Sequence, residues 1–172
     1  MPYTIELQLN RAAEAKFLKC WDILRDEGIT DLSYRMGYRP HVTLGMYHEI
    51  DEAKTIAKLE TFSAGETTIP LEFRHFTVAG TSIICQPRES AAARKFHARF
   101  EKKFGKSFRD IDHAGIWMPH CTIGMEIPTG KIGKAADKLI RAWQPIAGVA
   151  DRIALVKFRP GQVLWRKALK KA

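Results

Sequence analysis

Two short stretches of the chain carry the same set of residues that could do chemistry. Residues 40–46 read Pro-His-Val-Thr-Leu-Gly-Met, and residues 119–125 read Pro-His-Cys-Thr-Ile-Gly-Met. The second stretch begins 79 residues after the first, and the two differ at only two positions. A match of this length in a chain of 172 residues indicates a tandem duplication, with one copy of a site in each half.

Each copy has the composition of a short strand, with β-branched and aliphatic residues after an entry proline. Successive side chains of a strand point to opposite faces, so His41 and Thr43 share one face and lie about 7 Å apart. Val42 points the other way, toward a core. In the second copy, His120 and Thr122 share a face in the same manner. We therefore expect both copies to present His and Thr to a site.

Two imidazoles on opposite walls of a groove can act as an acid/base pair, because imidazole titrates near neutral pH. The neutral ring accepts a proton from a nucleophile, and the protonated ring gives one to a leaving group. Two threonine hydroxyls and an imidazolium suit the non-bridging oxygens of a phosphodiester. Such a site needs no metal. The alternatives are two structural histidines, or a metal site whose third ligand does not repeat at the same offset.

The elements that must position these strands also occur twice, and the first four of the five matched elements begin 78–80 residues apart. In the first half the patterns predict strands at 3–9, 39–47 and 68–79, and helices at 11–27 and 52–63. In the second half they predict strands at 81–86, 118–126, 151–158 and 162–167, and helices at 91–104 and 131–143. The four expected helix N-caps are Asn10, Asp51, Ser90 and Thr129. The strand at 3–9 alternates, which predicts burial of one face only.

Each half is thus β-α-β-α-β, and the fold class is α+β. We expect a single bilobal domain over residues 1–172, with halves at about 1–79 and 80–172 related by a pseudo-twofold axis. Helices should cover the outer faces. The two His-x-Thr strands should then face one another across a central groove.

Charge and composition narrow the class of partner. The net charge is +9, and residues 94–172 carry eighteen Lys and Arg against six Asp and Glu. A one-sided positive field suits RNA or DNA, although a solvated basic surface would have the same composition. No apolar run is long enough to cross a membrane, and the first residues lack the pattern of a signal peptide, so we expect a cytoplasmic protein. Cys20, Cys85 and Cys121 are expected to be reduced core residues.

The paired His-x-Thr-aliphatic motifs and the segment Phe158-Arg-Pro-Gly-Gln-Val-Leu-Trp165 resemble the two-histidine (2H) phosphoesterase superfamily. The nearest branch is the group of 2′-5′ RNA ligases and RNA 2′,3′-cyclic phosphodiesterases. The resemblance covers essentially the whole chain. It implies that His41 and His120 are the acid/base pair, that Thr43 and Thr122 bind the phosphate, and that no cofactor is used. It implies hydrolysis of 2′,3′-cyclic phosphates, typically to a 2′-phosphate, and in some members 2′-5′ ligation.

The chain departs from the family pattern after the second motif, where some members carry an aromatic residue and this sequence reads Gly-Met-Glu. Alternation would place Tyr47 on the face of His41, where it could take that role. Arg39 could contact phosphate, and Trp117 could stack on a base, although a packed tryptophan is the commoner case.

The function expected from the sequence is a metal-independent cyclic phosphodiesterase that acts on an RNA end or a cyclic nucleotide. No membrane and no obligate protein partner is indicated. One alternative is an RNA-binding module with a weak or inactive site. Another is the same chemistry on a different phosphoester, such as a 2′-5′ oligonucleotide or a cyclic ADP-ribose phosphate.

Overall fold

The computed structural model describes residues 1–172, which form a single mixed α/β unit with one antiparallel sheet. The strands are β1 (Tyr3–Leu9), β2 (His41–Tyr47), β3 (Ile69–Ala79), β4 (Ser82–Pro87), β5 (Cys121–Gly124), β6 (Ile146–Lys157) and β7 (Gln162–Ala168). The α-helices are α1 (Arg11–Asp26), α2 (Leu32–Arg35), α3 (Glu52–Ala64), α4 (Ala91–Phe104) and α5 (Ile132–Ala142). Two 3₁₀ turns, η1 (Asp110–Asp112) and η2 (Thr129–Lys131), complete the set. The α+β class predicted from the sequence is confirmed.

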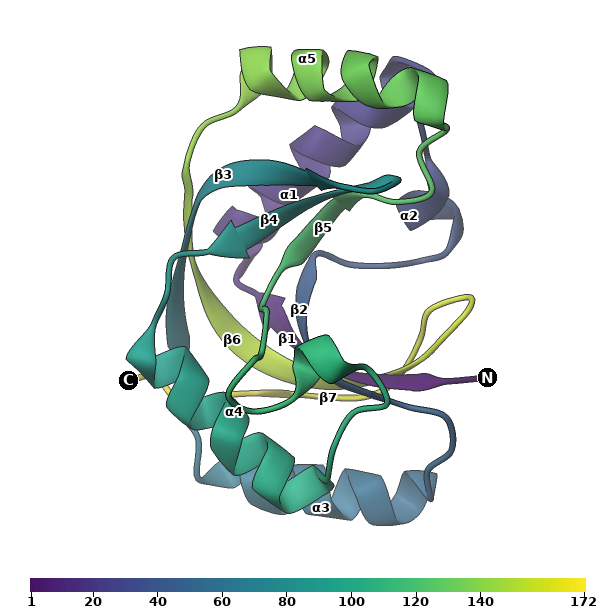
Figure 1. Cartoon of the computed structure of the whole chain (residues 1–172). Coiled ribbons are helices and arrows are strands. Elements are labelled where there is room, and N and C mark those ends of the chain that lie inside the picture. Colours follow the sequence, from purple (N-terminus) through teal and green to yellow (C-terminus); the bar gives the residue numbers. More distant parts are fainter.

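The strand order is β2-β1-β6-β3-β4-β5, and β7 pairs with β6. The long strand β6 joins the two sides of the sheet, because its first part pairs with β3 and its later part pairs with β1 and β7. Figure 1 shows α1 and α5 at one end of the molecule and α3 and α4 at the other, with β2 and β5 between them. The predicted layout, with helices outside and the two motif strands in the middle, has this form.

Strands and helices of the two expected halves pair and pack with one another. Strand β3, from the first half, pairs with β4, and β6, from the second half, pairs with β1. Helix α1 packs against β5, and α4 packs against β2, so each motif strand is supported by a helix from the other half. The boundary near residue 79 falls in the turn between β3 and β4, where Gly80 has φ 61°. The division of the chain into 1–79 and 80–172 stays a prediction from the repeat.

Strand β1 differs from its prediction, because both of its faces are buried. Ile5 and Leu7 belong to the main hydrophobic core, as the alternation indicates. Thr4, Glu6 and Gln8 on the opposite face are also buried, at 3%, 3% and 1% exposure. Buried polar side chains cost free energy unless they are hydrogen-bonded, and a row of them is often retained because it has a function. This face is therefore a candidate wall of a site.

Most helix bounds agree with the sequence pattern to within one or two residues, but two of the four caps do not. Asp51 and Ser90 accept hydrogen bonds from the backbone N–H three residues later, as expected of N-caps. Asn10 precedes α1, but its side chain instead accepts from the N–H of Val149 on β6. Thr129 lies within η2 and caps nothing, because α5 begins at Ile132.

Two strands of the second half also have different bounds. Strand β5 covers only four residues, against the nine expected for 118–126, because the chain on either side of it leaves the sheet. Strand β6 begins at Ile146, five residues before the predicted start. None of the helices has both the length and the apolar composition that crossing a membrane requires.

Candidate active site

The motif strands β2 and β5 are the first and last strands in the order of the sheet. They nevertheless contact each other near the middle of the molecule (Figure 1). Thr43 pairs with Glu6 on β1, and Thr122 pairs with Ile84 on β4. In both pairs the register then shifts by one residue, which is the pattern of a β-bulge. The bulges follow the same threonine in each copy, so the two motifs share their irregularity as well as their sequence.

Both catalytic candidates, His41 and His120, are oriented by a backbone carbonyl two residues upstream. Nδ1 of His41 lies 2.7 Å from the carbonyl oxygen of Arg39, and Nδ1 of His120 lies 2.8 Å from that of Met118. Because a carbonyl only accepts, Nδ1 must carry the proton in each ring. The Nε2 atom of each neutral ring is then free to accept a proton, which is the state a general base requires.

The two threonines of the motifs are held through their backbones. The carbonyl of Thr43 accepts a hydrogen bond of 3.0 Å from the indole N–H of Trp117. The carbonyl of Thr122 accepts one of 3.2 Å from the indole N–H of Trp21 on α1. Each tryptophan comes from the other half of the chain, so these bonds tie the two motif strands to opposite lobes. These hydrogen bonds engage the threonine backbones and not their hydroxyls.

A carboxylate accompanies only one of the two histidines. Glu6 Oε2 lies 3.6 Å from Nε2 of His41, and Glu6 Oε1 accepts a hydrogen bond of 3.0 Å from Gln8. At the corresponding position beside the second motif stands Ile84, which can neither accept a hydrogen bond nor carry charge. The site is therefore symmetric in its histidines and asymmetric in charge. The duplication could have revealed this difference, since Glu6 and Ile84 occupy matched positions in the repeat.

The second histidine has a cation for a neighbour instead. Burial is the main cause that lowers the pKa of His120, and the positive charges of Arg109 and His41 lower it further. Arg109 lies in the loop after α4, where it pairs with the buried carboxylate of Asp112 at 2.9 Å. Its guanidinium also contacts Sδ of Met46, which pairs with Thr4 on β1. Sequence reasoning missed Arg109, because this loop has no repeated pattern.

The remaining candidates from the sequence take other places. Arg39 directs its guanidinium to Glu14 on α1, at 2.7 Å, while its carbonyl orients His41. The prediction that Tyr47 shares the face of His41 is wrong, because the bulge in β2 breaks the alternation after Thr43. Tyr47 pairs with the core residue Tyr3, and its hydroxyl donates to the carbonyl of Gly105 at the end of α4.

Trp117 is 3% exposed, and its ring stacks on His97 with 4.2 Å between centroids. Its N–H donates to the backbone carbonyl of Thr43, so in this structure the indole holds the motif strand β2 in place. His97 covers one face of the indole, so a base would have to stack on the other face.

The cysteines and the acidic residues form neither a reactive-thiol site nor a metal site. Cys20, Cys85 and Cys121 are unpaired and buried, as predicted, and burial raises the pKa of Cys20 to about 11. A buried neutral thiol is a poor nucleophile. No group of three or more His, Cys, Asp or Glu side chains has the geometry to hold a metal ion.

Comparison with known proteins identifies the family. The model of the 2′-5′ RNA ligase superfamily matches residues 39–162, a span that contains both motifs. The chain belongs to the 2′-5′ RNA ligase superfamily. This membership confirms the resemblance to the 2H phosphoesterases that the two motifs predict.

Two solved structures share the fold of this superfamily member. One is TT0787 of Thermus thermophilus, with a TM-score of 0.61, 14% identity and 99% of each chain covered. The other is Usb1 of Kluyveromyces marxianus, with a TM-score of 0.50, 10% identity and 98% of each chain covered. At such identities the likeness concerns the fold alone. A search of curated proteins finds no match.

Proposed function

We propose that this protein is a metal-independent phosphodiesterase that hydrolyses 2′,3′-cyclic phosphates at RNA ends or on nucleotides, with His41 and His120 as its acid/base pair. The observation that carries the proposal is the pair of matched imidazoles, each with Nδ1 bonded to a carbonyl and Nε2 free. Membership of the 2′-5′ RNA ligase superfamily supports RNA as the substrate class.

The asymmetry of charge assigns the roles in this proposal. His120, whose pKa is lowered, is neutral near pH 7 and accepts the proton of the attacking water through Nε2. The water oxygen bonds to phosphorus as one ring P–O bond breaks. His41, whose Nε2 lies 3.6 Å from the carboxylate of Glu6, gives its proton to the departing ribose oxygen in this scheme. Each histidine ends in the other's starting protonation state, and proton exchange with water resets the pair.

The non-bridging oxygens need donors during this step, and the residues beside the histidines supply them. We assign this role to the hydroxyls of Thr43 and Thr122, which lie on the two edge strands of the sheet, each two residues after a candidate histidine. Arg109 adds a positive charge on the side of His120. Preorganised donors of this kind stabilise the charge that develops on the phosphoryl oxygens.

The proposal is tested by incubating the protein with the four 2′,3′-cyclic nucleotides and an RNA oligonucleotide that ends in a cyclic phosphate, all in EDTA. We expect each active substrate to give one nucleotide phosphate, with 2′- and 3′-isomers distinguished by ³¹P NMR. Loss of turnover on adding EDTA, with recovery on adding a divalent metal, would contradict the proposal. Testing a 2′-5′-linked oligonucleotide and a cyclic ADP-ribose phosphate in parallel covers the same chemistry on other phosphoesters.

The net charge of +9 favours a second candidate function, an RNA-binding module with little turnover. That function predicts RNA binding that persists unchanged when both His41 and His120 are replaced by Ala, together with no hydrolysis by the wild type. Turnover that depends on both histidines excludes it.

A further inference from the structure

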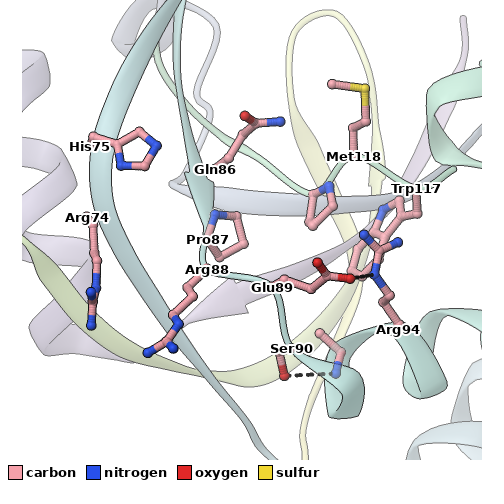
Figure 2. A pocket seen from close by; sticks show the side chains of 12 residues that line it. Arg74, His75, Gln86, Pro87, Arg88, Glu89, Ser90, Arg94, Trp117 and Met118 are labelled. Atoms are coloured by element: carbon pink, nitrogen blue, oxygen red, sulfur yellow. Dashed lines mark hydrogen bonds and ion pairs between the residues drawn. The ribbon is translucent and has the colours of Figure 1, made fainter.

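A hollow rich in arginine lies beside the second motif and is not used in the chemistry described above. It has a volume of about 420 Å³ and is formed by β3, the end of β4, the start of α4 and the segment before His120. Figure 2 shows its side chains. Those that carry charge or can hydrogen-bond at its surface include Arg74, His75, Gln86, Arg88, Glu89 and Arg94. Its size falls within the range of about 300–1,000 Å³ typical of ligand sites.

The hollow adjoins the second motif. Two of its lining residues, Met118 and Pro119, directly precede His120 in the chain. A third, Gln86, follows Ile84 by two residues on β4, so its side chain lies on the strand face that Ile84 shares with Thr122. A ligand bound with its phosphorus between the histidines could therefore continue along the chain of lining residues into the hollow.

The positive charge of the hollow is only partly compensated. Arg74 and Arg88 share one carboxylate, Glu72, at 2.9 and 3.9 Å, and Arg94 pairs with Glu89 at 2.7 Å. All three arginine side chains are between 46% and 67% exposed. Ion pairs this exposed are weak, and a guanidinium can exchange such a partner for a phosphate, which it binds through two parallel hydrogen bonds.

The equivalent hollow in the first half provides an internal comparison. It is lined by Tyr38, Arg39 and Pro40, which lie 79 residues before Trp117, Met118 and Pro119, and it has a volume of about 430 Å³. There the buried carboxylate of Glu14 faces Arg39 at 2.7 Å and Arg152 at 3.9 Å.

Helices α1 and α4 begin 80 residues apart, so the helical position of Glu14 corresponds to Arg94. None of the residues that line the second hollow is a buried carboxylate. Of these two hollows, only the one beside His120 therefore has exposed arginines without a buried carboxylate among them. A substrate strand that leaves the site on one side only would need one such hollow and not two.

From these observations we propose that the hollow beside His120 binds the backbone phosphate of the RNA nucleotide next to the reacting phosphate, so that the preferred substrate is an RNA strand and not a free cyclic mononucleotide. This inference rests on the proposed function, because it assumes that the reacting phosphate sits between the two histidines. Arg74 and Arg88 are the main contacts, since they share a single carboxylate.

The test compares kcat/KM for a 2′,3′-cyclic mononucleotide with that for a short RNA ending in a cyclic phosphate. The wild type should prefer the RNA by about tenfold or more, the scale of one or two charge-assisted contacts. The double variant R74Q/R88Q should lose most of this preference. It should also reduce the dependence of log(kcat/KM) for RNA on log[salt] by about one unit. The matched control is Arg141→Gln, which removes an exposed arginine paired with Asp137 on α5.

An RNA preference that is the same in R74Q/R88Q, R141Q and the wild type would overturn the inference while leaving the proposed function intact. If the wild type turns over neither substrate, the proposed function fails and the hollow is tested by binding instead. Fluorescence anisotropy with a labelled RNA oligonucleotide should then show weaker binding for R74Q/R88Q than for R141Q, and equal affinities would overturn the inference. Equal melting temperatures of the three proteins confirm that the comparison concerns folded protein.

Discussion

Glu6 lies across the strand pair from Thr43 and places a carboxylate oxygen 3.6 Å from Nε2 of His41. In the second copy, the matched position beside Thr122 is occupied by Ile84. Two motifs with nearly identical sequences thus sit in different electrostatic surroundings. This difference is the basis on which we propose His41 as the acid and His120 as the base.

Replacing Glu6 with Gln should lower kcat by about ten- to a hundredfold, below the full contribution of about 10²–10⁴ from a general acid. The amide keeps the volume and can still accept the hydrogen bond from Gln8, but it removes the negative charge that lies 3.6 Å from Nε2 of His41. Steady-state kinetics on a cyclic nucleotide measure the effect. Glu27→Gln, at a surface carboxylate that pairs with Lys134 and Lys138, is the matched control.

A substrate with a better leaving group separates the acid from the base. A p-nitrophenyl phosphodiester of a nucleotide releases an anion that needs no proton, so the losses caused by Glu6→Gln and His41→Ala should largely disappear on it. The loss caused by His120→Ala should remain, because the nucleophile still requires a base. The reverse pattern would show that the roles of the two histidines are exchanged.

Arg109→Gln should raise the pKa of His120, since it removes one of the positive charges that lower it. A base with a higher pKa stays protonated to a higher pH, so the acidic limb of the kcat/KM profile should move upward. The profile of the wild type should have its acidic limb below the ordinary histidine pKa of about 6.5. A variant that loses activity at every pH without moving this limb would contradict the assignment of His120 as the base.

The two indole N–H groups that hold the motif strands give a matched pair of stability tests. Trp117→Phe and Trp21→Phe each remove one hydrogen bond to a threonine carbonyl. Each change should cost about 1–2 kcal/mol in the free energy of unfolding, because it leaves a carbonyl with one partner fewer and reduces buried contact area. Urea denaturation provides the measurement. If either variant unfolds at the same urea concentration as the wild type, that hydrogen bond does not contribute.

The repeat and the apolar periodicity are sufficient to predict the fold class, the order of the main elements and the presence of two matched motifs. Helix α4 is predicted at residues 91–104, where the structure has it, because Ser90 caps it and Gly105 ends it. These are local signals, in which a few neighbouring residues fix a boundary.

The errors have causes that act over longer distances. The bulge after Thr43 moves Tyr47 to the other face, and alternation cannot reveal a bulge that forms only when β2 pairs with β1. Asn10 bonds to Val149, which is 139 residues away in the chain, in place of capping α1. The polar face of β1 has the sequence pattern of an exposed face, and its burial depends on segments that are distant in the chain, such as those of Tyr38 and Phe158.

The site residues divide in the same way. His41, Thr43, His120 and Thr122 are predictable because the motif occurs twice. The repeat could show that Glu6 matches Ile84, but the contact of Glu6 with His41 across a strand pair and the approach of Arg109 from a loop become visible only in the structure. Charges brought together by tertiary structure have no signature in a single sequence.

The most direct test of the account is the turnover of a 2′,3′-cyclic phosphate, in EDTA, by the wild type, by His41→Ala, by His120→Ala and by the double variant. We expect a loss of about a hundredfold or more in each single variant, and little further loss in the double variant, because the two groups act in one step. Retention of wild-type turnover in either single variant would contradict the claim that the two histidines form the acid/base pair.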